Sequence, residues 1–149
     1  MSAQKAYMTV DSNGALSLEI EDTVVVNADK DNVIFVSFLR NIDDDTENTK
    51  QAQSGVDKCY KIISKQGLER PAKVIVDLRP MGNRNNISAQ AKELYKNFIV
   101  DPRVAKVAVL GSSGTQATIT NFVLNFKGEF KDKLAWFSNE TEARYWVNQ

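Results

Sequence analysis

Histidine is absent from the sequence, and Cys59 is its single cysteine. Because histidine is the commonest general base and the commonest ligand of transition metals, Ser-His-Asp and Cys-His catalytic groups are excluded. One cysteine can form neither a disulfide nor a thiolate zinc site within one chain. Catalysis would have to use carboxylates, lysine or a cofactor, and we expect neither a cofactor nor a metal.

A net charge of one sign is also missing, because 19 Lys and Arg residues balance 19 Asp and Glu residues. Such a chain has no positive field that attracts phosphates, so we expect no nucleic-acid partner. The longest apolar runs, such as residues 104–110, fall far short of the roughly 20 residues that cross a bilayer. Residues 1–10 lack the apolar segment of a secretory signal. We therefore expect a cytoplasmic protein with no membrane span.

Proline and glycine are scarce, with 3 and 7 residues in a chain of 149. No repeat and no linker rich in Pro, Gly or Ser divides the chain. Its length, and a hydrophobic fraction of 42%, suffice for one hydrophobic core. We expect a single domain over residues 1–149.

The first forty residues predict an antiparallel start to a sheet. Short β-prone runs occur at residues 6–10, 16–21 and 33–38, with polar turn residues between them. The first two runs are joined by Asp-Ser-Asn-Gly at 11–14, whose residue types suit a tight hairpin turn.

The remaining sequence alternates between helical and strand patterns. Apolar residues recur at helical spacing before Gly67, a natural stop, which predicts a helix over residues 46–66. Buried strands are predicted at residues 72–78, 104–110 and 134–137, each followed by apolar residues at helical spacing. We therefore predict an α/β fold with a single mixed sheet, in which antiparallel N-terminal strands precede three βα units. The helices pack on the sheet through right-handed crossovers.

The last strand and helix carry a recognisable motif. Residues 133–147 read Lys-Leu-Ala-Trp-Phe-Ser-Asn-Glu-Thr-Glu-Ala-Arg-Tyr-Trp-Val, and Asn139 with Glu142 forms a capping box at the start of the helix. This ending resembles the close of STAS/SEC14-like domains. By that resemblance, Ala143 and Trp146 face the sheet.

The resemblance extends upstream, because residues 74–79 resemble the central strand of that family and residues 104–111 the next one. The order of elements also matches across nearly the whole chain. The resemblance implies a module that binds proteins or small, often apolar, ligands. Bacterial anti-sigma-factor antagonists, which are regulators switched by serine phosphorylation, belong to this group.

The chain departs from the switching members after the central strand. Those members carry an Asp-Ser-Ser-Gly type of turn there, whereas residues 82–88 read Gly-Asn-Arg-Asn-Asn-Ile-Ser. Ser88 is the one hydroxyl of this loop, and its alignment to the phosphorylated serine is approximate. A phosphate on Ser88 would place a dianion at a helix N-terminus beside Arg84. The Ser-Ser-Gly at residues 112–114 follows a different strand, so the role is not transferred to it.

Two strand-to-helix loops form the predicted binding site. Open α/β sheets bind ligands at the carboxyl ends of their strands, and N–H groups at a helix start, with arginines nearby, hold phosphate or carboxylate. The alternative is that these residues only cap helices and shape turns. The two loops lie side by side if their strands are adjacent and parallel. The predicted binding residues are Arg79, Asn83, Arg84, Asn86, Ser88, Gly111, Ser112, Ser113 and Thr115.

Three further features have a structural interpretation beside a functional one. The acidic run 43–45 with Glu47 offers oxygen ligands to a hard cation, but acids before a helix also complement its dipole. Cys59 occupies a helical core position, where packing is favoured over reactivity. Five aromatic residues would line either an apolar ligand cavity or the core, and their spacing favours the core: Phe122, Phe126, Phe130, Trp136 and Trp146.

Three functions are compatible with the sequence. The first is a non-enzymatic module that binds a protein partner or a small ligand at the carboxyl ends of the central strands. The second is a carrier of an apolar ligand such as a lipid, with a cavity beneath the long helices. The third is an enzyme, but its candidate groups, which are Asp77, Arg79, Arg84 and the hydroxyls nearby, include no evident pair of base and nucleophile. A homodimer is compatible with each function.

Overall fold

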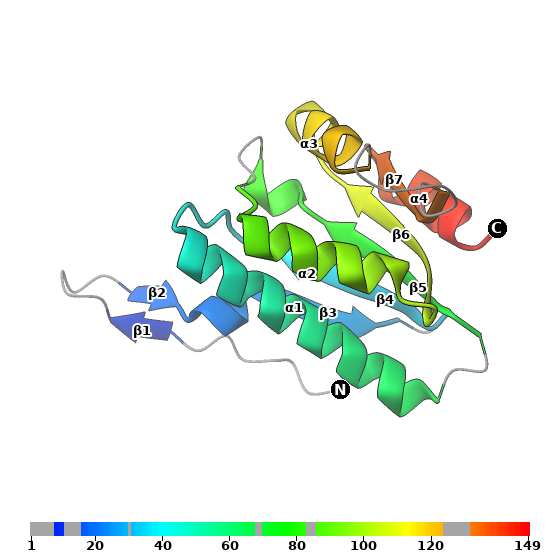
Figure 1. Ribbon diagram of the computed structural model, residues 1–149, viewed down its shortest axis with the longest axis horizontal. Helices are drawn as coiled ribbons and strands as arrows, with labels where there is room; N and C mark the ends of the chain where they lie inside the picture. Colours follow the sequence, from blue (N-terminus) through cyan, green and yellow to red (C-terminus); the bar gives the residue numbers. More distant parts are fainter. Residues whose placement is uncertain (1–7, 11–15, 30, 68–69, 83–85, 124–131) are drawn as a thin grey trace.

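A five-stranded sheet is the centre of the fold, and helices pack on both of its faces (Figure 1). The computed structural model describes residues 8–10, 16–29, 31–67, 70–82, 86–123 and 132–149. Its strands are β1 (Met8–Val10), β2 (Leu16–Leu18), β3 (Val24–Ala28), β4 (Val33–Phe38), β5 (Ala72–Asp77), β6 (Val104–Leu110) and β7 (Leu134–Phe137). Its helices are α1 (Asp45–Gln66), α2 (Ala89–Val100), α3 (Ser113–Val123) and α4 (Glu140–Val147), with short 3-10 turns η1 (Ile20–Thr23) and η2 (Arg79–Met81).

The strand order in the sheet is β3-β4-β5-β6-β7. β3 and β4 are antiparallel, whereas β4, β5, β6 and β7 are parallel to one another. In register, Val36 of β4 lies opposite Val76 of β5, and Val76 lies opposite Val109 of β6. The carboxyl ends of four strands therefore meet at one edge of the sheet, where the predicted binding loops begin.

The predicted fold class is confirmed: the chain is α/β, with a mixed sheet, an antiparallel start and three βα units after it. Two details differ. β1 and β2 form a two-stranded sheet of their own, and β4 with α1 makes a fourth βα step. The strand β3 was not predicted, although its run of β-branched residues, Val24 to Val26, is typical of a strand.

Helix α1 confirms the helix predicted over residues 46–66, and both of its ends are capped. The Asp44 carboxylate accepts a hydrogen bond of 2.9 Å from the Glu47 N–H, and Gly67 ends the helix with a positive φ of 52°. A left-handed residue at that position favours glycine. No helix in the described ranges is both long enough and apolar enough to span a membrane.

The front face of the sheet, defined here as the face covered by α1, α2 and α3, holds the larger core. Figure 1 shows α1 and α2 lying across this face. Valines of β3, β4, β5 and β6 pack there against Val56 and Ile63 of α1, Phe98 and Ile99 of α2 and Ile119 of α3. This alternation of front-facing residues along each strand is what the period of two predicts.

The back face is covered by α4 and holds a smaller core. Ala143 and Val147 of α4 are buried against Val33, Ile75 and Leu110. The Asn139 side chain accepts a hydrogen bond of 2.9 Å from the Glu142 N–H, which confirms the predicted helix start. The Trp146 ring is half-buried beside Phe137, with ring centroids 5.5 Å apart.

Candidate functional site

The two predicted binding loops do lie side by side. β5 and β6 are adjacent and parallel, and the Ser112 hydroxyl donates a hydrogen bond of 3.1 Å to the carbonyl of Gly82. Asn83 and Arg84 lie outside the described residues. The polar groups of the other predicted residues can be traced one by one.

Arg79 binds carboxylates of the protein itself. Its Nε and Nη2 donate to the two oxygens of Asp77, at 2.8 and 3.0 Å, and Nη2 also lies 3.5 Å from Glu140 Oε1. The hydrogen bonds that Arg79 donates to Asp77 raise the pKa of Arg79. Asp77 is buried, so this pair supplies neither a free cation nor a free base.

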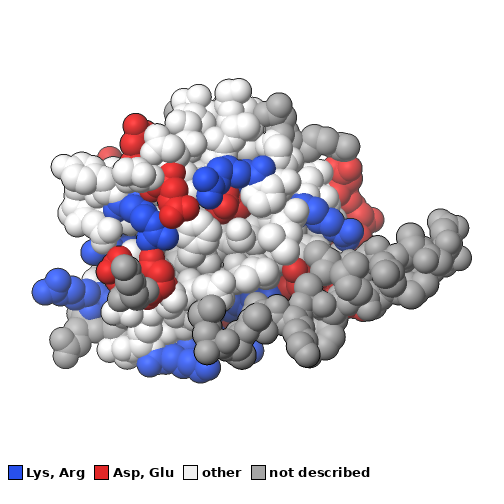
Figure 2. Space-filling model, turned by 180° about the vertical axis from the view of Figure 1, so that it is seen from behind, with Lys and Arg blue, Asp and Glu red and all other residues white. Residues whose placement is uncertain are grey.

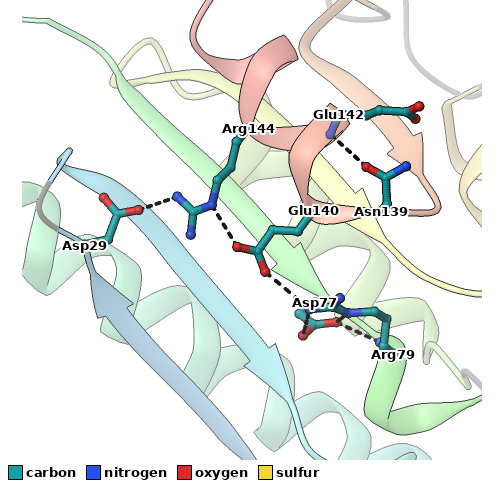
Figure 3. Close-up of polar contacts among 7 residues, drawn as sticks. All are labelled: Asp29, Asp77, Arg79, Asn139, Glu140, Glu142 and Arg144. Carbon is teal, nitrogen blue, oxygen red and sulfur yellow. Dashed lines mark hydrogen bonds and ion pairs between the residues drawn. The ribbon is translucent and has the colours of Figure 1, made fainter.

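The contacts of Arg79 extend into a row of alternating charges across the back face (Figure 3). Glu140 accepts a hydrogen bond of 2.8 Å from Arg144 Nε, and Arg144 Nη1 pairs with Asp29. We call these five residues, Asp29, Asp77, Arg79, Glu140 and Arg144, the charge row. Figure 2 shows acidic and basic side chains interspersed on this side of the molecule. The back face therefore presents no field of one sign to a charged partner.

Ser88 is the N-cap of α2 and only 4% exposed. Its hydroxyl accepts a hydrogen bond of 3.0 Å from the Ala91 N–H and lies 2.6 Å from the Thr49 hydroxyl of α1. Its own N–H donates to Asn48 Oδ1 at 2.9 Å. The capping interpretation is confirmed. A phosphate on Ser88 would have to break these contacts, so phosphorylation requires the start of α2 to separate from α1.

Asn86 holds its loop to the segment before α1. Its side-chain Nδ2 donates to the carbonyl of Ile42 at 3.2 Å, and its N–H donates to Asn41 Oδ1 at 2.6 Å. Its contacts are therefore with the protein's own chain and serve to position the loop.

The second loop is also built for packing. Thr115 is fully buried: its hydroxyl donates to the carbonyl of Ser112 at 2.7 Å and accepts from Trp136 Nε1 at 3.2 Å. A Cβ at Gly111 would lie 2.0 Å from that hydroxyl oxygen, so glycine is needed there for close approach. Ser113 is exposed as the first residue of α3.

The acidic run and Cys59 have structural roles. Asp44 caps α1, and Asp45 accepts a hydrogen bond of 3.3 Å from Asn86. The described residues contain no group of three or more acidic or cysteine side chains placed to hold a metal. Burial raises the pKa of the Cys59 thiol to about 12, which leaves it protonated and unreactive at neutral pH.

An apolar cavity of about 100 Å³ lies on the front face, between the sheet and the helices. The described residues in its wall carry no charge. They come from β4 to β7, from η2 and its loop, and from α1, α2 and α3: Val36, Phe38, Gln51, Gly55, Val56, Cys59, Val74, Val76, Leu78, Met81, Asn86, Ile87, Tyr95, Phe98, Ile99, Val107, Val109, Ile119 and Leu134.

The cavity is partly open, and its lining indicates where. Val74 is fully buried, whereas Val76, two residues further along the same face of β5, is half-buried. Met81 and Ile87, which follow β5 in the chain, are half-buried as well. The cavity therefore extends toward the carboxyl ends of the strands and the predicted binding loop.

Of the predicted aromatic residues, the two whose side chains are described do not form this wall. Phe38, Tyr95 and Phe98 line the cavity, whereas Trp136 and Trp146 are not among its lining residues. Phe126 and Phe130 lie outside the described residues, and the side chain of Phe122 is not described. Tyr95 and Phe98 belong to the apolar residues at helical spacing that follow residues 72–78, but spacing cannot distinguish a filled core from a hollow one.

Comparisons with family models, with curated proteins and with solved structures returned no match. The resemblance to STAS/SEC14-like domains therefore stays a prediction.

Proposed function

We propose that this protein is a non-enzymatic binding module that takes a small, neutral, apolar ligand into the front-face cavity. The observation that carries the proposal is the cavity itself, with its apolar wall and its opening toward the carboxyl ends of the strands. The proposal combines two of the predicted functions. It takes the ligand position, at the carboxyl ends of the strands, from the binding module and the apolar ligand from the carrier.

An unfilled cavity of this size costs stability. At about 24 cal/mol for each Å³ of cavity, a volume of about 100 Å³ corresponds to about 2 kcal/mol. That is a substantial share of the roughly 5–15 kcal/mol by which domains are stable. A ligand that fills the space restores dispersion contacts and stabilises the folded state.

The size and the wall of the cavity define the ligand class. An engineered apolar cavity of about 150 Å³ in another protein binds benzene, so a single ring or a short alkyl chain suits about 100 Å³. An ion would lose its hydration without gaining a charged partner among the described lining residues. We therefore expect a neutral molecule.

We also propose that the module belongs to the STAS/SEC14-like group. The support is architectural: the parallel order of β4 to β7 and the packing of Ala143 against the back of the sheet. Architecture alone does not assign function, so the cavity remains the basis of the ligand proposal.

The test compares toluene binding to the wild type and to two valine variants. Binding is measured by ligand-observed NMR and by the shift of the unfolding temperature. Val74→Ile places a methyl group beside the cavity, and we expect it to weaken toluene binding at least about threefold because the remaining space shrinks. Val33→Ile makes the same change at a fully buried position of the back face, away from the cavity. We expect it to leave toluene affinity unchanged.

The apo stabilities of the two variants give a second readout. We expect Val33→Ile to destabilise the protein by about 1–3 kcal/mol through overpacking, and Val74→Ile to change stability by less than about 0.5 kcal/mol or to raise it. Absence of toluene binding to the wild type, or equal effects of the two substitutions on affinity, would contradict the proposal.

A further inference from the structure

Among the polar side chains of the cavity wall are two whose oxygen atoms form no hydrogen bond as acceptor or donor with the described residues. Tyr95 of α2 and Gln51 of α1 both line the cavity. Buried tyrosine hydroxyls and amide oxygens are nearly always hydrogen-bonded in folded proteins. A polar atom in a cavity wall that no protein group satisfies is satisfied by water or by a ligand.

Tyr95 is held in the wall by its ring. The ring packs edge-on against Phe38, with centroids 6.1 Å apart and planes at 88°. Burial, with a smaller effect of Cys59, raises the pKa of its hydroxyl, so the group is a neutral donor and acceptor at physiological pH. Among the described residues, none forms a hydrogen bond with this hydroxyl.

Gln51 is 3% exposed, and the nitrogen and the oxygen of its side-chain amide differ in their hydrogen bonds. Its Nε2 donates to the Thr23 hydroxyl at 3.0 Å and to the carbonyl of Arg40 at 3.1 Å. These bonds orient the amide, and its Oε1 accepts no hydrogen bond from a described residue.

Neither oxygen is sealed inside protein atoms. Among the described residues, the fully enclosed side-chain oxygen without a partner is that of Gln66, not that of Tyr95 or Gln51. Both oxygens therefore keep some accessible surface, and both side chains belong to the wall of the cavity. An otherwise apolar wall thus offers a small number of hydrogen-bonding atoms, as ligand sites commonly do.

From this juxtaposition we infer that the cavity selects a ligand with one neutral hydroxyl group on an apolar body, such as a phenol or a small alcohol, and that Tyr95 bonds that hydroxyl. Gln51 Oε1 is the second acceptor in the wall. The inference rests on the proposed function and narrows its ligand class. A ligand hydroxyl can donate and accept at once, so it satisfies groups that a hydrocarbon leaves unpaired.

The test compares phenol with toluene, which have nearly the same shape, in the wild type and in Tyr95→Phe, by titration calorimetry. We expect Tyr95→Phe to weaken phenol binding about 3–10-fold, the usual range for one net hydrogen bond, and to change toluene binding less than twofold. Tyr145→Phe is the matched control, because Tyr145 lies on α4 and is 71% exposed. It should change neither affinity.

The outcomes separate the two claims. If toluene binds but Tyr95→Phe affects phenol and toluene equally, the inference about the hydroxyl is wrong and the apolar cavity site stands. If neither compound binds the wild type, both claims fall. The unfolding temperature of Tyr95→Phe checks that the variant is folded, and removal of one oxygen from a retained ring makes that outcome expected.

Discussion

The two faces of the sheet are packed in opposite ways. The front face carries three helices and the larger apolar core, yet it contains the cavity. The back face carries the eight-residue helix α4 and a much smaller apolar core. On this face the ion pairs of the charge row add to the apolar packing. The face with more apolar surface is thus the one that leaves space unfilled.

The charge row shows how the smaller face is held. Arg144 of α4 joins Glu140 to Asp29 beyond β3, and its guanidinium lies 5.8 Å from the centre of the Phe35 ring. Arg79 then connects Glu140 to Asp77 at the end of β5. A short helix with few buried residues gains from such links, whereas the front face has enough apolar contact to tolerate a hollow.

Truncation of a core isoleucine on each face should give the largest contrast. We expect Ile75→Ala on the back face to lower the free energy of unfolding by about 2–5 kcal/mol, because Ile75 is fully buried. Ile99→Ala on the front face should cost less, because Ile99 lines the cavity and alanine is the better helix former in α2. Urea unfolding measures both. A smaller loss for Ile75→Ala than for Ile99→Ala would overturn the contrast between the faces.

Loss of Arg144 from the charge row should have an intermediate effect on stability. Arg144→Gln removes the ion pairs to Asp29 and Glu140, and we expect a loss of about 1 kcal/mol, since the side chains are partly exposed. Arg144→Lys keeps the positive charge but not the guanidinium group that bonds two carboxylates at once. We expect it to lose less stability than Arg144→Gln. Thermal unfolding at low and high salt measures the effect. If the wild type and Arg144→Gln respond equally to salt, the row does not stabilise α4.

We expect the smallest effect from Asp101, a carboxylate at the edge of the sheet where the parallel strands begin. The effect is a dependence of the free energy of unfolding on pH. Asp101 follows α2 and accepts hydrogen bonds of 3.1 and 2.9 Å from Arg103, which hold the pKa of Asp101 at about 2. In an unfolded chain the pKa of an aspartate is about 4. Because the pKa is lower in the folded state, the stabilisation is complete above pH 4 and is lost as the pH falls to 2.

Urea unfolding of the wild type and Asp101→Asn between pH 5 and pH 2 checks this dependence. The variant cannot titrate at this position, so its stability should fall less steeply through that window. Identical slopes would show that Asp101 contributes nothing to the acid sensitivity.

Sequence patterns located most of the elements because periodicity and end signals agreed. The alternation of strand and helix periods placed β5, β6 and β7 within a residue or two, and Gly67 marked the end of α1. The antiparallel start was less well placed. The 3-10 turn Ile20–Thr23 begins within the last two residues of the predicted second strand, and β3 follows it without the polar break that separated the other predicted strands.

The two predicted loops lie together at the carboxyl edge of the sheet, as predicted, but the contacts of their residues were not predictable. Arg79 resembles an anion ligand in the sequence, yet it binds Asp77, two residues away, and contacts Glu140, 61 residues away in the chain. Ser88 and Thr49, 39 residues apart, bring their hydroxyls to 2.6 Å. Such pairings depend on which helix starts meet, and a local pattern carries no information about that.

The sequence by itself determined the fold class, the strand-to-helix order and the identity of the inner faces, because these follow from local periodicity and capping. Only the tertiary structure decided that the front core is hollow and that Tyr95 and Gln51 border the hollow. A cavity is a difference between the volume that the elements enclose and the volume that their side chains fill. That difference exists only once residues from β4 to β7 and three helices have been brought together.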